Sequence, residues 1–183
     1  IHMSVTSNVV QMDLGKKNIV SDDLLLGAAA TFVDRNADDP AQLGRNSCNT
    51  IRALYVKNST GSALGSGKGV LFKSGKLGKE VNGYHSANGR CDGVVDPFLG
   101  AGVTVADGDY FWLIIAGPID VEVGAGDLTV NSVVQTLTSG RFGTGTAGTN
   151  PIGHSGISDE AGTEDGRARV FFRSSFAAAV APW

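Results

Sequence analysis

The chain offers few residues of the types that perform chemistry, and its thiols and imidazoles are the first to consider. The cysteines are Cys48 and Cys91, and the histidines within the body of the chain are His85 and His154. A thiolate nucleophile needs a neighbouring base, so His85 and Cys91 form a candidate pair. Asn-Gly dipeptides occupy residues 82–89 around them, which is typical of a solvated loop. We therefore favour a loop over a catalytic pair.

A serine nucleophile is also conceivable at Ser155. The segment 153–157 reads Gly-His-Ser-Gly-Ile and nearly matches a nucleophile elbow. Ile157 stands where the last glycine belongs, and no strand-to-helix pattern surrounds Ser155. The sequence does not predict a hydrolase site here.

Two glycine-rich segments imitate phosphate-binding motifs. Residues 143–148 match the dinucleotide fingerprint, and Glu164 or Asp165 follows about twenty residues after its start, as that motif requires. The third glycine must open a helix, but Thr-Asn-Pro-Ile comes next and cannot propagate one. Residues 61–69 resemble a phosphate loop with the wrong spacing, and Gly69 replaces the Mg²⁺-binding hydroxyl. A hairpin turn is the better interpretation of this second segment.

The acidic residues do not form a recognisable metal site. Asp107 and Asp109 flank Gly108, where turn carboxylates usually bond their own backbone. The acidic segment 159–165 could hold a cation, but it lacks the spacing of a calcium loop. The cysteines and histidines lack structural-zinc spacing. We predict no catalytic, cofactor-binding or metal-binding residues, no cofactor and no enzymatic activity.

The elements that would carry any site are strands. Gly supplies 26 of 183 residues, about twice the usual share of roughly 7%, and separates short apolar runs. The apolar run Tyr110–Ala116 predicts a strand buried on both faces, with Trp112 in the core. Residues 119–123 alternate between apolar and acidic, which predicts a half-buried strand. With Gly117-Pro118 between them, the two predict a hairpin at the centre of an all-β domain.

The rest of the chain fits the same architecture. Further strands are expected at 50–57, 70–72, 94–95, 103–106, 128–138 and 168–173, with long exposed loops at 73–92 and 139–162. A short helix is expected after Ser21, which resembles an N-cap. The fold class is therefore all-β: a small single-domain β-sandwich or barrel with long loops, an N-terminal arm and at most one or two short helices. Residues 1–20 form the arm, with 1–2 read as a cloning remnant, and residues 21–183 form the β-rich domain.

Charge is distributed unevenly along the chain. Residues 45–90 hold eight basic residues against one acid, whereas residues 91–183 hold eleven acids against four arginines. The folded domain could present faces of opposite sign, although folding could equally interleave the charges. A pI near 5.5 does not favour nucleic-acid binding, and no apolar span is long enough for a membrane helix. Free thiols are favoured over a Cys48–Cys91 disulfide, because nothing else indicates an oxidising compartment.

Three segments resemble the small capsid decoration (cement) proteins of tailed bacteriophages. They are Leu54–Gly65, Val103–Leu113 and Gly162–Phe172. The first is similar to the strand, Asn and polar turn of such proteins, and the last to a closing strand fed by an Asp-Gly loop. The arm and the 73–92 loop depart from a minimal cement module.

The resemblance implies a structural virion protein on the outside of a phage capsid, made in the host cytoplasm during assembly. Such proteins bridge major capsid subunits and stabilise the expanded shell, commonly as homotrimers. The expected partners are the major capsid protein and further copies of the chain, with no nucleic acid and no membrane. The alternative is a receptor- or glycan-binding β module of a phage fibre or bacterial surface protein. Exposed aromatics in the two long loops would favour that alternative, and the sequence offers Tyr84 and Phe142 there.

Overall fold

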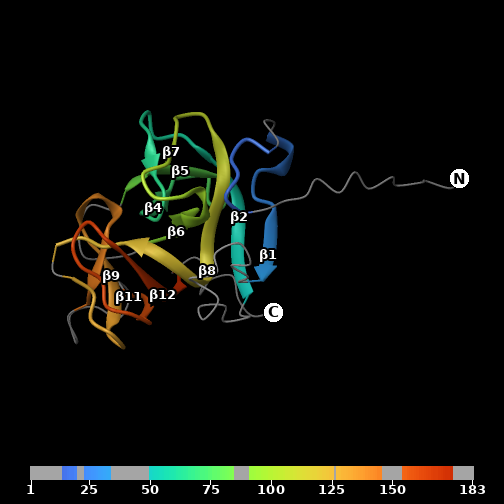
Figure 1. Cartoon of the computed structure of the whole chain (residues 1–183). Helices are drawn as coiled ribbons and strands as arrows, with labels where there is room; N and C mark the ends of the chain where they lie inside the picture. Colours follow the sequence, from blue (N-terminus) through green and yellow to red (C-terminus); the bar gives the residue numbers. More distant parts are fainter. Residues whose placement is uncertain are drawn as a thin grey trace, which may run out of the picture.

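The structure is a computed structural model, and it describes residues 14–19, 23–33, 50–84, 91–125, 127–145 and 154–174. The predicted all-β class is confirmed, and the only helices in these ranges are single 3-10 turns (Figure 1). The strands are β1 (Ala29–Val33), β2 (Thr50–Asn58), β3 (Leu64–Gly65), β4 (Gly69–Phe72), β5 (Glu80–Tyr84), β6 (Gly93–Val95), β7 (Thr104–Val105), β8 (Tyr110–Glu122), β9 (Val133–Thr136), β10 (Phe142–Thr144), β11 (His154–Ser158) and β12 (Arg167–Arg173). The 3-10 turns are η1 (Asp23–Leu25), η3 (Pro97–Leu99) and η4 (Thr138–Gly140).

Five of the strands close into a small barrel. β2 pairs with β5, β5 with β4, β4 with β6, β6 with β8, and β8 returns to β2. The β2–β5 pair is parallel and the others are antiparallel. Closure satisfies the backbone hydrogen bonds of strands that would otherwise lie at an edge. β1 adds to β2 on the outside of this ring.

A second group of strands extends from the barrel along β8. β12 pairs with the second half of β8, and β11, β9 and β10 follow in order across the sheet. In Figure 1 this flanking sheet, orange to red, lies to one side of β8, while the green barrel strands lie beside its first half. β8 is therefore shared by the barrel and the flanking sheet.

The expected hairpin at Gly117-Pro118 is wrong, because β8 continues through both residues. Arg52 of β2 pairs with Ala116, and no further β2 residue pairs beyond it, whereas β12 pairs with β8 from Ala116 to Glu122. Pro118 thus lies past the last β2 partner, where its missing N–H interrupts no β2–β8 ladder. The predicted burial is confirmed for Tyr110–Ile115, whereas Ala116 is half-buried; Asp120 and Glu122 are more exposed than their neighbours, as the alternation predicted.

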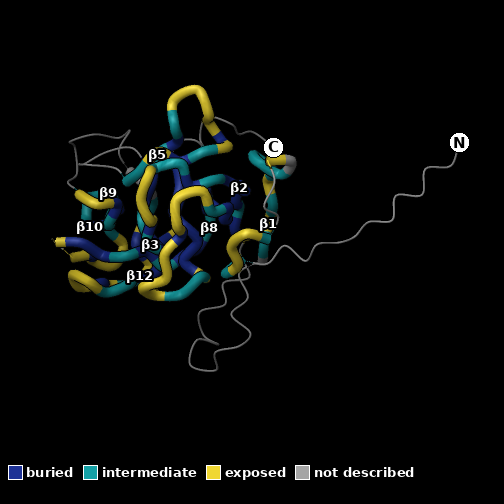
Figure 2. Tube along the Cα trace, turned by 90° about the horizontal axis from the view of Figure 1, so that it is seen from above, coloured by how far each residue is buried: buried dark blue, intermediate teal, exposed yellow. Residues whose placement is uncertain are grey.

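Two apolar clusters hold the fold together. One cluster lies inside the barrel and includes Leu54, Val70, Val81 and Leu113. The other packs the outer wall of β2 and β8 against the flanking sheet, and its members include Trp112. Figure 2 shows the buried, dark blue segments converging on the strands at the centre of the molecule.

Other sequence expectations need correction. The loop expected at 73–92 contains β5, and the loop expected at 139–162 contains β10 and β11. Both segments carry so many glycines and polar residues that their short strands have no apolar alternation to reveal them. The helix expected after Ser21 is the single 3-10 turn η1. No helix in the described ranges is long and apolar enough to span a membrane.

Candidate functional site

Cys91 is a packing residue in this structure rather than an exposed thiol. Its side chain is 1% exposed, and its Sγ lies 3.0 Å from the carbonyl oxygen of Gly93. Burial raises the pKa of this thiol to about 12, so it stays protonated and a poor nucleophile near neutral pH. Gly69 lies directly against it, since an added Cβ there would come within 2.8 Å of the sulfur. Cys48 lies outside the described residues.

The other nucleophile and base candidates are not brought together in the described part of the chain. His154 and Ser155 begin β11, a strand that pairs with β9 and β12, so no strand-to-helix elbow forms there. His85 lies outside the described residues.

The two glycine-rich segments also have structural roles where they are described. Gly143 lies within β10, and residues 146–148 fall outside the described ranges. In the other segment, Lys68 bonds Glu122 at 3.4 Å and lies over the ring of Tyr84. That lysine is therefore already engaged by protein groups.

The acidic residues act as local hydrogen-bond acceptors. Asp109 accepts from the backbone N–H of Ala106, as expected for a turn carboxylate, and Asp107 accepts from that of Gly61. Glu160 accepts from the backbone N–H of Arg169. Among the residues that the structure describes, no group of three or more His, Cys, Asp or Glu side chains could hold a metal ion.

The described part of the predicted arm, residues 14–19, lies against the body of the domain. The Gly15 N–H donates to Asp96 Oδ2 at 2.7 Å, and Asn18 exchanges two hydrogen bonds with the backbone of Tyr110. Lys17 forms an ion pair with Asp109 at 3.2 Å. A Cβ at Gly15 would come within 2.8 Å of the carbonyl oxygen of Phe98, so only glycine allows this close approach. These residues form a strap across η3 and the start of β8.

Asp96 is the buried acid that anchors the strap. Its carboxylate also accepts from the Phe98 N–H at 2.9 Å and caps η3. Burial raises the pKa of this carboxyl to about 6, because the two N–H donors only partly replace lost hydration. Sequence reasoning missed Asp96, although Asp followed by Pro97 is a recognisable helix-start signal.

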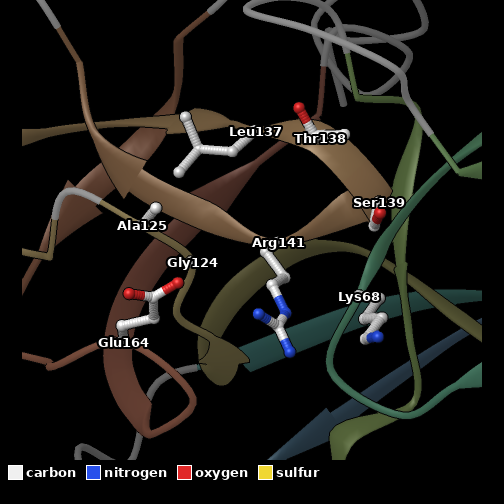
Figure 3. A pocket seen from close by; sticks show the side chains of 8 residues that line it. All are labelled: Lys68, Gly124, Ala125, Leu137, Thr138, Ser139, Arg141 and Glu164. Atoms are coloured by element: carbon white, nitrogen blue, oxygen red, sulfur yellow. The ribbon is translucent and has the colours of Figure 1, made fainter.

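One charged feature of the surface is a hollow of about 520 Å³ between Lys68, which precedes β4, the turn η4 and the loop before β12. Figure 3 shows Arg141 in this hollow, with Lys68 to one side and Glu164 to the other. A second hollow of about 480 Å³ lies beyond Arg141. Both are open depressions.

Arg141, which lines both hollows, is already paired with carboxylates of the protein. Arg141 Nε bonds Glu122 at 2.9 Å, and its Nη2 bonds Asp165 at 2.7 Å. The hydrogen bond that Arg141 donates to Glu122 is the main cause that raises the pKa of Arg141 above its ordinary value. The two cations that line the first hollow, Lys68 and Arg141, are therefore each bonded to a carboxylate of the protein.

The fold resembles that of a solved phage structure. The N base of the head fibre protein gp8.5 of bacteriophage phi29 aligns with a TM-score of 0.50, covering 67% of this chain and 93% of that one at 16% identity. At this identity the likeness is one of fold. The chain matches no protein-family model and no curated protein sequence.

Proposed function

We propose that this chain is a structural virion protein that binds the outside of a phage capsid and bridges major capsid subunits. On this proposal it stabilises the expanded shell, acts as a homotrimer and assembles in the host cytoplasm. The single observation that carries the proposal is the likeness in fold to the base of a phage head fibre. It is independent of the three sequence segments that resemble cement proteins, so two separate lines support a virion role.

The construction of the body supports a mechanical role. The barrel interior is filled by side chains, of which Leu64, Val70 and Leu113 are fully buried. Cys91, the best nucleophile candidate in the described residues, is buried, and Arg141 in the charged hollow is bonded to Glu122 and Asp165. Such a molecule is suited to adding rigid contact area to a larger assembly.

The strap supports a docking role for the residues that precede it. Gly15 and Asn18 are fixed on η3 and β8, so the chain before Leu14 joins the body at a defined place. An arm that becomes ordered on a neighbouring subunit would exchange chain entropy for added contact. Many weak contacts suffice when copies are arrayed on a shell.

The direct test mixes the purified full chain with expanded, undecorated shells of its own phage. Co-sedimentation and quantified copy number should give saturable binding in a fixed ratio to the major capsid protein. Unexpanded shells serve as the control and should bind fewer copies. Absence of binding at moderate salt would defeat the proposal.

The arm can be tested by two deletions. Removing residues 3–13 should weaken shell binding and leave the melting temperature unchanged. Removing residues 3–20 should also lower the melting temperature, because it deletes the bonds of Gly15 and Asn18 to the body. Full shell binding by the shorter deletion would show that the arm makes no contact with the shell.

The alternative, a receptor- or glycan-binding fibre module, is kept because the structural neighbour is part of a fibre. The two aromatics that the sequence offered for sugar stacking do not form a platform. Phe142 is fully buried, and the hydroxyl of Tyr84 accepts from the Gly65 N–H. Binding of the chain to a host-wall glycan array, with no binding to shells, would favour this alternative.

A further inference from the structure

The outer face of the flanking sheet carries an exposed apolar pair. Phe171 of β12 and Ile157 of β11 lie directly opposite each other and are 42% and 55% exposed. Opposite residues in an antiparallel pair share a face, so the two side chains lie together. Large exposed apolar side chains gathered at one place usually mark a contact surface.

The pair belongs to a row that crosses four strands. Pro118 of β8 pairs with Phe171, and Ile157 pairs with Val133 of β9. Pro118 is buried and Val133 is half-buried, so the row is most exposed at its centre. An aromatic centre flanked by more buried neighbours is the usual form of an interface hot spot.

Charges of opposite sign lie on the two sides of this row. Arg173 lies on one side of the row, two residues after Phe171 on β12, and it is exposed. On the other side, three acidic residues lie next to Arg169. Asp120 bonds its guanidinium at 3.5 Å, Glu160 accepts from its backbone N–H, and the backbone N–H of Asp159 donates to its carbonyl oxygen. Arg173 and Asp159 form no ion pair with any residue in the described ranges. The face is therefore positive on one side of the apolar row and negative on the other.

This arrangement is complementary to itself. A two-fold axis can lie in the plane of the interface and run along the row, perpendicular to the strands. A rotation by 180° about this axis places Phe171 and Ile157 of one molecule against the same residues of the other. It also places Arg173 of each molecule over the acidic side of the other. An axis parallel to the strands would instead bring the two arginines together, which is repulsive.

We propose that a second copy of this chain docks on the row Pro118–Phe171–Ile157–Val133 through such a two-fold contact. This deepens the self-association expected under the proposed function and rests on it. The contact is two-fold, so it is separate from a three-fold contact within a trimer and would join neighbouring trimers on a shell. The apolar centre is small beside a stable interface, which buries roughly 1,200–2,000 Å². The contact is therefore weak in solution and becomes effective in an array.

The test is sedimentation velocity of the full chain over a range of concentrations, without shells. The weight-average mass of the wild type should rise with concentration. Phe171→Asp should shift this rise to at least about ten-fold higher concentration, equivalent to about 1.4 kcal/mol. The matched control is Leu77→Asp, which changes a 59% exposed leucine in the turn between β4 and β5 and should leave the rise unchanged.

A charge exchange tests the geometry. Arg173→Glu and Asp159→Arg should each weaken self-association, and the double variant should restore it to within about two-fold of the wild type. Melting temperatures check that every variant is folded. Identical mass distributions for the wild type and Phe171→Asp would overturn the proposal, and failure of the double variant to recover would overturn the two-fold geometry.

Two further outcomes would assign the face to another occupant and so overturn the proposal. If Phe171→Asp lowers shell binding with self-association unchanged, the capsid covers this face. If it lowers only the melting temperature, another segment of the same chain covers it. Failure of the proposed function itself is distinguished by the wild type, which would then not bind shells at all.

Discussion

The two halves of β8 have different surroundings although they belong to one continuous strand. From Tyr110 to Ile115 each residue is buried, because one face lines the barrel and the other packs in the second cluster. From Ile119 to Glu122, apolar residues face the core and acids face outwards. The difference shows that a buried strand need not end where its environment changes. Substitutions in the two halves should therefore differ in the size of their effect on stability.

The largest effect is expected in the first half, at Trp112. Its ring is 1% exposed and packs edge-on against Tyr55 and Phe32. Trp112→Ala should lower the free energy of unfolding by about 3–5 kcal/mol. Phe171→Ala, on the exposed face beyond the second half, should cost less than about 1 kcal/mol in dilute solution. Urea unfolding of both variants measures the two losses of unfolding free energy. Equal losses would show that the two positions do not differ in their contribution to stability.

The second effect is a pH dependence of the folding stability, and it is expected at Asp96. This residue lies beside the first half of β8, where its backbone N–H donates to the carbonyl oxygen of Trp112. The folded pKa of Asp96, about 6, lies above the unfolded value of about 3.9, so the folded state binds the proton more tightly. The stabilisation from this group is complete below about pH 4 and is lost as pH rises through 6.

The matched variant for this effect is Asp96→Asn, which does not titrate. The free energy of unfolding of the wild type, relative to the variant, should fall by up to about 3 kcal/mol between pH 4 and pH 7. Chemical unfolding at several pH values measures this difference. Parallel pH curves for the two proteins would show that Asp96 titrates normally.

The junction between the halves should be sensitive to a single methyl group. Gly117 has φ +122°, and an added Cβ would lie 2.6 Å from the carbonyl oxygen of Thr50. Gly117→Ala should therefore destabilise by about 2–3 kcal/mol. Gly75→Ala is the control, with a positive φ but open space around it, and should cost only about 1 kcal/mol. Equal losses of unfolding free energy in the two variants would mean that the close approach of Gly117 to β2 does not contribute to the destabilisation.

The smallest effect is expected in the second half, at Glu122. Its Oε1 accepts from Arg141 at 2.9 Å and Lys68 at 3.4 Å, and all three side chains are partly exposed. Glu122→Gln should cost less than about 1 kcal/mol, and the loss should shrink as salt is added. A loss of several kcal/mol, independent of salt, would place this network in the core instead.

The fold class could be predicted from the sequence because its signal is local. The run Tyr110–Ala116 and the alternation after it indicate strands without any knowledge of their partners. The closure of the barrel could not be predicted, since it depends on β2 pairing with both β5 and β8. The false hairpin at Gly117-Pro118 has the same origin, because the loss of the β2 partner there is a long-range property.

The exposed apolar row on the flanking sheet was less predictable from the sequence than the fold. In the sequence, Ile157 stands out only as a mismatch in a nucleophile motif, and Phe171 only as part of a predicted closing strand. Their exposure depends on which way β11 and β12 face, and alternation is too weak in these strands to decide it. The inertness of Cys91 likewise follows from its tertiary neighbours rather than from its sequence context.

Because β8 is shared by the barrel and the flanking sheet, it determines how the domain responds to mechanical force. A force applied to the flanking sheet reaches the barrel through the covalent backbone of Tyr110–Glu122, not only through side-chain contacts. Within the barrel, that strand is held by hydrogen bonds on both sides, to β2 and β6. Pulling along β8 would shear both ladders at once rather than peel one bond at a time, so the domain should rupture at high force and as one unit.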